Sequence, residues 1–140
     1  MSIDAIQPIT RKLVPEGMRA AHADRLFRMH FPLRLEPAVF AMACRLSPNY
    51  GGGFWHFYAL SNGGFYMAPQ SDKVFQVVSE NGFEGQLCAD AMGITSCLYA
   101  YSHLSFGEDA MTDTWSEHYH LLRAYMAGHG DAAAIMAAID

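Results

Sequence analysis

The sequence has little cysteine and no segment typical of a membrane helix or of an exported protein. Its three cysteines, Cys44, Cys88 and Cys97, are an odd number and form no CxxC pair, which argues against a disulfide scaffold or a cysteine-rich zinc site. No run approaches the ~20 apolar residues that a membrane helix needs. The first residues, MSIDAIQPITRKLVPEG, lack the apolar stretch of a signal peptide. We therefore expect free thiols, no membrane partner and a cytoplasmic location.

Basic residues are scarce in the second half of the chain. Residues 71–140 contain two of them, Lys73 and Arg123, against ten acids, whereas residues 1–70 contain seven against four. The halves thus carry charges of −8 and +3, which together give the net charge of −5. Affinity for nucleic acid depends on cations that neutralise phosphates, so no stable DNA binding is expected of the acidic half. A basic protein partner would suit it better, although a solvated acidic surface is the ordinary interpretation.

Recognisable catalytic and metal-binding motifs are also missing. There is no GxSxG nucleophile motif and no HExxH motif. His118 and His120 are two residues apart, so on a helix they point about 200° away from each other and cannot share a metal ion. The run Gly51 to Gly53 precedes a predicted strand and lacks the lysine of a phosphate-binding loop. We predict no catalytic residue, no metal and no cofactor.

The most informative segment that is present is YGGGFWHFYALSNGGFYMAP, from Tyr50 to Pro69. Two aromatic-rich runs flank Asn62-Gly63, a pair typical of a two-residue type I′ turn in a β-hairpin. That turn would pair Leu60 with Phe65, and both faces of the hairpin would be apolar, as in a ribbon covered on both sides. The residues that define this structural motif are Trp55, Tyr58, Asn62, Gly63, Phe65, Tyr66 and Pro69.

The rest of the chain predicts a second hairpin and several helices. Strands at 73–78 and 83–87 would join through Asn81-Gly82. Apolar spacing predicts helices from about residue 17 to Pro32, over 36–46 and over 89–103, then one that begins with a capping box at Thr114 and a short one capped by Asp131. The fold class is therefore α+β, with a small antiparallel sheet of about four strands in two hairpins, packed with about five helices. Residues 1–16 are expected to be a flexible arm and residues 17–140 a single domain.

Three blocks of this sequence resemble the ArdB/KlcA family of antirestriction proteins. They are the hairpin block, the run ENGFEGQLCADAMGI from Glu80 to Ile94, and YHLLRAYMAGH from Tyr119 to His129; the terminal AAID also fits the pattern. The resemblance covers roughly residues 20 to 140. It implies a non-enzymatic protein of plasmids and other mobile elements that inhibits type I restriction-modification systems of the host. The expected partner is the type I restriction complex or a host factor that controls it.

Under this hypothesis, exposed acids and the C-terminus contact the partner. The candidate partner-binding residues are Glu84, Asp90, Glu108, Asp109, Asp113, Glu117 and Asp140. One alternative is a small enzyme or ligand-binding protein with an aromatic pocket around His56, Trp55 and Tyr58, in which a buried histidine would serve as general base. Another is nucleic-acid binding through basic residues of the first half, namely Arg11, Lys12, Arg19, Arg25 and Arg28.

Overall fold

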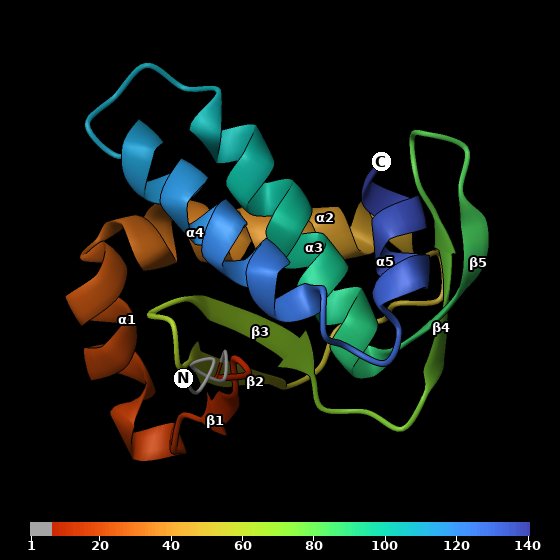
Figure 1. Ribbon diagram of the computed structural model, residues 1–140, viewed down its shortest axis with the longest axis horizontal. Coiled ribbons are helices and arrows are strands. Elements are labelled where there is room, and N and C mark those ends of the chain that lie inside the picture. Colours follow the sequence, from red (N-terminus) through yellow and green to blue (C-terminus); the bar gives the residue numbers. More distant parts are fainter. Residues whose placement is uncertain (1–6) are drawn as a thin grey trace, which may run out of the picture.

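The computed structural model describes residues 7–140, which form five strands, five α-helices and two short helices of other types (Figure 1). In chain order the elements are β1 (Arg11–Leu13), the 3-10 helix η1 (Glu16–Met18), α1 (Arg19–Phe27), the π-helix η2 (Phe31–Leu35), α2 (Glu36–Leu46), β2 (Trp55–Leu60), β3 (Phe65–Pro69), β4 (Val74–Val78), β5 (Glu84–Cys88), α3 (Ala89–Ser105), α4 (Thr112–Met126) and α5 (Ala132–Ile139). The predicted α+β class, the two antiparallel hairpins and the five helices are confirmed, although the strands lie in two separate sheets.

The first hairpin forms where predicted, but its turn and register differ. Leu60 pairs with Gly64, and Ala59, not Leu60, faces Phe65. The loop therefore contains three residues, and only Gly63 adopts a positive φ, of 93°. This is the geometry of a type I turn followed by a left-handed residue. The predicted type I′ turn is wrong, and the one-residue shift places Phe57, Phe65 and Trp55 together on one face.

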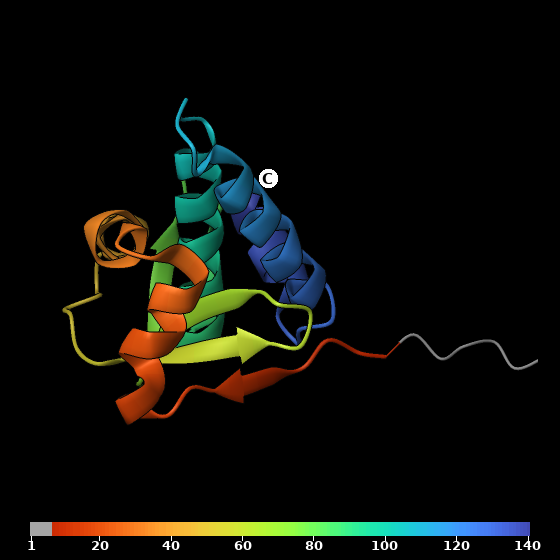
Figure 2. The same cartoon turned by 90° about the vertical axis from the view of Figure 1, so that its left-hand side faces the viewer.

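A third strand, β1, completes this first sheet, in the order β1-β2-β3. Arg11 faces Leu60 and Leu13 faces Tyr58, so β2 is the central strand. Residues 1–16 were expected to be a flexible arm, but residues 11–13 form this edge strand (Figure 2). Residues 1–6 lie outside the described residues.

The second hairpin, β4-β5, is a separate two-stranded sheet. Its bounds lie within one residue of those predicted, and Gly82, at φ 93°, supplies the left-handed residue of its turn. The side chain of Asn49 holds the outer edge of β4, because it accepts a hydrogen bond from the Gln76 N–H (3.0 Å) and donates one to the Val74 carbonyl (3.3 Å).

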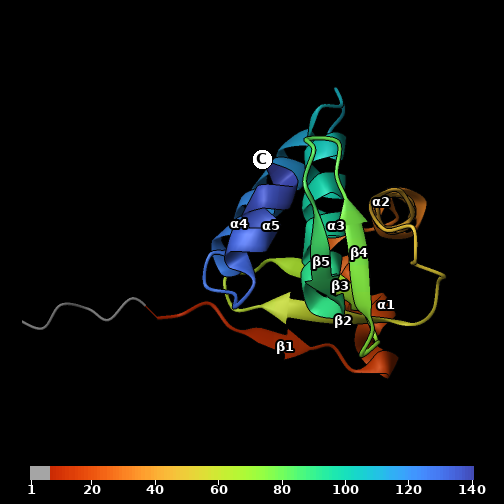
Figure 3. The ribbon, with the colours of Figure 1, turned by 90° about the vertical axis from the view of Figure 1, so that its right-hand side faces the viewer.

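Helix α3 is the centre of the molecule. It packs on β3, α2, α4 and α5, and Figure 3 shows it between α2 on one side and α4 and α5 on the other, with the β4-β5 ribbon alongside. Eleven of its 17 residues are buried. Gly93 lets it lie directly on β3, since a Cβ there would stand 2.6 Å from the carbonyl oxygen of Met67.

The helical boundaries correct three predictions. The single helix expected up to Pro32 is divided into η1, α1 and the π-helix η2, with Arg28 at a positive φ of 55° between the last two. Helix α4 begins at Thr112, so Thr114 lies inside it and the predicted capping box is wrong. Asp131 occupies the N-cap position of α5, but its side chain makes no capping hydrogen bond.

Candidate functional site

Three polar side chains from distant parts of the chain meet around the carboxylate of Asp90. Arg11 Nη1 lies 2.5 Å from Asp90 Oδ1 and 2.7 Å from the Tyr66 hydroxyl, which itself donates to Asp90 Oδ1 at 2.8 Å. His129 Nε2 lies 2.8 Å from Asp90 Oδ2. We call these four residues, Arg11, Tyr66, Asp90 and His129, the polar cluster. It joins β1, β3, the start of α3 and the α4–α5 connection.

The local structure explains how Asp90 and His129 are placed. Asp90 is the second residue of α3, where the positive end of the helix dipole favours a carboxylate. The His129 ring is oriented by the backbone, because Nδ1 accepts the Asp131 N–H at 2.9 Å. Nε2 then carries the proton and donates it to Asp90. Both oxygens of Asp90 are thus bonded within the cluster, and both ring nitrogens of His129 have partners, Nε2 in Asp90 and Nδ1 in the Asp131 N–H.

Aromatic rings enclose the polar cluster. The guanidinium carbon of Arg11 lies 4.3 Å from the ring centroid of Tyr58, Tyr58 stacks on Tyr66 at 4.9 Å, and Tyr66 stacks on Tyr125 at 5.7 Å. Burial, together with the negative charge of Asp90, raises the pKa of Tyr66. Tyr66 therefore stays protonated at neutral pH and remains a hydrogen-bond donor to Asp90.

The chemistry available near the cluster is limited. Cys88, the residue that caps α3, donates its thiol to Asp131 Oδ2 at 3.2 Å. Burial of the sulfur raises the pKa of Cys88, and the hydrogen bond to Asp131 adds to the effect, so the reactive thiolate is disfavoured. The arrangement of the cluster suits a brace between elements, since both oxygens of Asp90, the Tyr66 hydroxyl and both ring nitrogens of His129 have hydrogen-bond partners.

Three members of the cluster were singled out from the sequence for other reasons, and their contact with one another was not predicted. Asp90 was predicted as a partner-binding acid and Tyr66 as part of the hairpin motif. Arg11 was considered for nucleic-acid binding, and His129 appeared only within a family block. The available indication was that Tyr66, Asp90 and His129 belong to the three blocks that resemble the family, one residue to each.

The predicted partner-binding acids do not form one group. Glu108 and Asp109 lie in the α3–α4 loop, Asp113 and Glu117 on the first turns of α4, Glu84 at the start of β5, and Asp140 after α5. Figure 1 shows the α3–α4 loop at the upper left and the β4–β5 turn and the C-terminus on the right, and all six residues are exposed. Asp90 lies at the end of α3 opposite the α3–α4 loop, about 22 Å from Ser105 by the rise per residue, and is half-buried in the polar cluster.

Asp109 differs from the other exposed acids because it organises the loop. Its Oδ1 accepts the Met111 N–H at 2.8 Å, and its Oδ2 lies 2.6 Å from Arg34 Nη1. The Met111 hydrogen bond and the Arg34 guanidinium lower the pKa of Asp109. This carboxylate fixes the α3–α4 loop to η2.

The aromatic pocket predicted around His56 is not formed. Trp55 points to the opposite face of β2, where it is buried, donates to the Tyr50 hydroxyl at 2.9 Å and packs on Phe40. His56 lies between Phe54 and Tyr58, with ring centroids 5.7 and 6.0 Å away. A hollow of about 280 Å³ does reach His56, but neither Trp55 nor Tyr58 lines it.

Three of the five basic residues considered for nucleic-acid binding are engaged elsewhere, and one of them, Arg25, donates to His22 Nδ1 at 2.9 Å. Arg11 belongs to the polar cluster, and Arg19 stacks on Phe57 at 3.9 Å while it donates to the Trp55 carbonyl at 2.8 Å. Across residues 7–140, no group of three or more His, Cys, Asp or Glu side chains is arranged to hold a metal ion. No helix in the same range has the length and apolar character needed to cross a membrane.

The family model that matches this chain and three similar relatives carry the description antirestriction protein. The family model for "Antirestriction protein" matches residues 48–140. Two Escherichia coli proteins named antirestriction protein KlcA are 43% identical over 138 residues, covering 96% of each chain, and 46% identical over 136 residues, covering 87% of this chain and 91% of the other. The putative antirestriction protein YubI of E. coli K12 is 34% identical over 139 residues, covering 96% of this chain and 97% of its own.

A solved structure also matches over the whole of both chains, with a TM-score of 0.89 and 40% identity. It comes from work on the KlcA and ArdB proteins, for which a novel fold is described, with antirestriction activity against type I DNA restriction systems in vivo but not in vitro.

Proposed function

Since this chain belongs to the antirestriction protein family, we propose that it inhibits type I restriction in the host cytoplasm and so protects incoming DNA of plasmids and other mobile elements. The observation that carries the proposal is the full-length structural match at 40% identity to proteins active against type I systems in vivo. The family resemblance of the three blocks points the same way, and the polar cluster unites one residue from each of them.

We propose that the chain acts by contact with a protein and not by catalysis. The carboxylate oxygens of Asp90 and the ring nitrogens of His129 all have hydrogen-bond partners, and burial together with the Asp131 hydrogen bond raises the pKa of Cys88. The relatives act in vivo but not in vitro, which supports a partner that the cell supplies, such as a host factor controlling the restriction complex. A purified type I enzyme should then be inhibited by this chain only after extract of the host cell is added.

The surface that we assign to this partner lies around the α3–α4 loop. Glu108, Asp113 and Glu117 are exposed there, and none of them makes a hydrogen bond or ion pair with the rest of residues 7–140. Asp109 holds the loop to Arg34 and gives these acids a fixed setting. Such a surface complements a basic partner, whose approach it would accelerate by long-range attraction.

The experiment that tests the proposal is the plating of unmodified phage on two otherwise identical hosts, with and without a type I restriction system. Expression of the chain should raise plating efficiency on the restricting host and leave it unchanged on the other. Plating that stays as low as without the protein, at matched expression of folded chain, would overturn the proposed function.

A triple variant tests whether the acidic surface is needed for protection while the fold stays intact. Glu108, Asp113 and Glu117 replaced together by Ser should lose most of the protection while the far-UV circular dichroism stays unchanged; Asp109 is kept because it organises the loop. The matched control replaces three exposed acids elsewhere, Glu16, Asp24 and Asp72, by Ser. Equal protection by the two triple variants would discard the acidic contact surface.

A further inference from the structure

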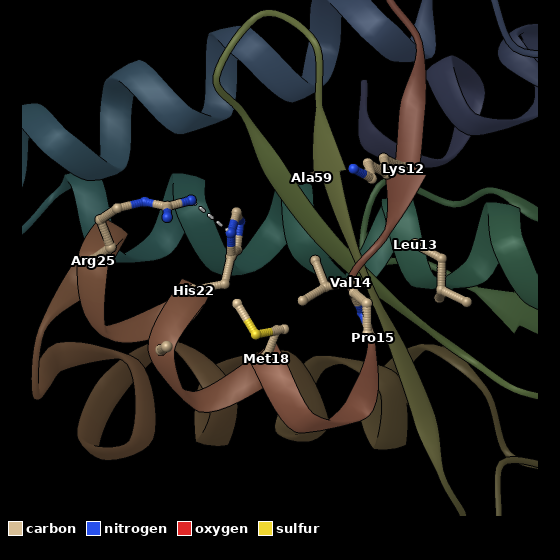
Figure 4. A pocket seen from close by; sticks show the side chains of 9 residues that line it. Lys12, Leu13, Val14, Pro15, Met18, His22, Arg25 and Ala59 are labelled. Atoms are coloured by element: carbon tan, nitrogen blue, oxygen red, sulfur yellow. Dashed lines mark hydrogen bonds between the residues drawn. The ribbon is translucent and has the colours of Figure 1, made fainter.

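A hollow of about 370 Å³ lies between α1 and β1, away from the polar cluster (Figure 4). Val14, Met18 and His22 point toward one another in it, and the figure shows Leu13 turned away. The hollow is mostly apolar, with His22, Lys12 and Arg25 as its polar side chains. Its lining residues are Lys12, Leu13, Val14, Pro15, Met18, Ala21, His22, Arg25 and Ala59. This volume falls at the small end of the range of ligand pockets, which begins at ~300 Å³.

The open edge of β1 runs beside this hollow. Ser61 N–H donates to the Thr10 carbonyl and Val14 N–H donates to the Phe57 carbonyl, both at 2.8 Å. Because hydrogen bonding alternates along an antiparallel pair, the N–H and C=O groups of Arg11 and Leu13 point away from β2. Among residues 7–140 these four groups have no hydrogen-bond partner, so the edge can accept another strand.

The charge around the hollow has one sign. Lys12 and Arg25 stand at its rim, and no acid is among the nine lining residues. Arg25 Nη2 donates to His22 Nδ1 at 2.9 Å, which leaves the other guanidinium donors of Arg25 for a ligand. A lysine on a short edge strand is also a common guard against self-association. The positive charge of Lys12 repels the same strand of a second copy of the chain, but it attracts an acidic peptide segment.

We propose that β1 and this hollow bind an extended acidic peptide segment of a partner protein, which adds a fourth strand to the first sheet and places one apolar side chain between Val14, Met18 and Ala21. Backbone hydrogen bonds to Arg11 and Leu13 supply affinity, and the hollow selects the side chain, as in other sites that bind peptides by strand addition. Acidic residues two positions before and after the apolar one lie on the same face and reach Lys12 and Arg25.

This site is separate from the acidic surface assigned above and does not depend on antirestriction activity. The Arg11 side chain turns to the opposite face of the sheet, toward Asp90, so the polar cluster holds β1 in place while its outer edge stays open. The chain would then carry two surfaces of opposite charge, one for a basic partner and one for an acidic segment.

Nuclear magnetic resonance of the ¹⁵N-labelled full chain tests the proposal. The probe is a capped seven-residue peptide with a central leucine, glutamates two residues to either side, and threonine or serine between. The amide resonances of Arg11 and Leu13 should shift downfield and saturate on titration. A peptide with lysines in place of the glutamates should bind at least about tenfold more weakly, and one N-methylated at the nitrogens facing β1 should not bind.

Two variants of α1 localise the binding. Ala21→Phe fills the hollow and should weaken binding at least about tenfold, whereas Ala20→Phe, the preceding exposed residue outside the hollow, should leave it unchanged. No saturable shift at millimolar peptide, equal binding of the two charge forms, or unchanged binding by Ala21→Phe would each overturn the proposal. Concentration-dependent shifts of the same amides without peptide would overturn it in favour of a second copy of the chain.

Discussion

Replacing Asp90 by Ala should remove the hydrogen bonds that connect α3 to β1, to β3 and to the α4–α5 connection. The carboxylate accepts from Arg11 of β1, from the hydroxyl of Tyr66 of β3 and from His129 of the α4–α5 connection. Without it, the fully buried Tyr66 loses the acceptor for its hydroxyl proton, and His129 loses the acceptor for its Nε2 proton. The strand β1 also loses the ion pair that ties it to α3.

The expected loss of unfolding free energy is about 3 kcal/mol. A buried hydroxyl left without its acceptor costs ~1–3 kcal/mol, and a hydrogen bond to a charged group contributes ~1.5–3 kcal/mol. The Arg11 side chain is 39% exposed, so its ion pair adds less than ~1 kcal/mol. Because the three contacts share one carboxylate, their contributions do not add fully. For a chain of this length, ~3 kcal/mol corresponds to a fall in melting temperature of roughly 6–12 °C.

Urea unfolding followed by tryptophan fluorescence measures this loss, since Trp55 and Trp115 are both buried. The matched control is Asp113→Ala, because Asp113 is also the second residue of an α-helix but is exposed. The control removes a similar helix-dipole interaction and should cost less than ~1 kcal/mol. In a double-mutant cycle, Tyr66→Phe and Asp90→Ala should couple by about 1 kcal/mol or more. An Asp90→Ala variant no less stable than Asp113→Ala would refute the assigned role of the cluster.

Three further perturbations follow from other parts of the structure. Gly93→Ala forces α3 away from β3 and should lower the unfolding free energy by about 3 kcal/mol. The control Gly17→Ala, at a position where no atom lies within 4 Å, should leave the unfolding free energy unchanged. Equal effects of the two substitutions would contradict the close packing of α3 on β3. Burial lowers the pKa of His118, so the folded state favours the neutral ring: stability is full above pH ~6.5 and falls as the pH drops from there through the lower pKa of the folded state. His118→Phe should flatten this loss in urea unfolding from pH 7 to 5, and His120→Phe should not; parallel curves for both would exclude His118 as the cause. Burial raises the pKa of Cys97 to about 12, so a thiol reagent should label the exposed Cys44 in the folded protein and Cys97 only after urea is added, whereas equal labelling rates of these two thiols would show that Cys97 is accessible.

The parts of the fold that could be predicted from the sequence are those set by local chemistry. Proline at position 37 marks the start of α2, and Asn81-Gly82 marks the turn of the second hairpin; both were placed within a residue. The first turn was misjudged because Ser61-Asn62-Gly63-Gly64 suits either a two- or a three-residue loop. Strand β1 was missed because three exposed residues show no alternation, and their partners lie about fifty positions away.

The polar cluster was beyond sequence reasoning for a related reason. Residues 11, 66, 90 and 129 have no common spacing, and the packing of α3 and the path of the α4–α5 connection bring them together. Asp90 was grouped with the exposed acids because charge alone does not distinguish a solvated carboxylate from one that is fully bonded. Its position at a helix N-terminus was predicted, but the three donors that it binds were not.

We propose that protection comes from the surface of the folded scaffold and that the polar cluster holds this scaffold together without reacting. His129→Gln tests it most directly, because a glutamine amide can still donate to Asp90 but cannot exchange protons as an imidazole does. Plating of unmodified phage on a restricting host that expresses this variant should match the parent protein. Loss of protection by a His129→Gln chain with unchanged unfolding free energy would contradict the claim and show that the cluster is reactive.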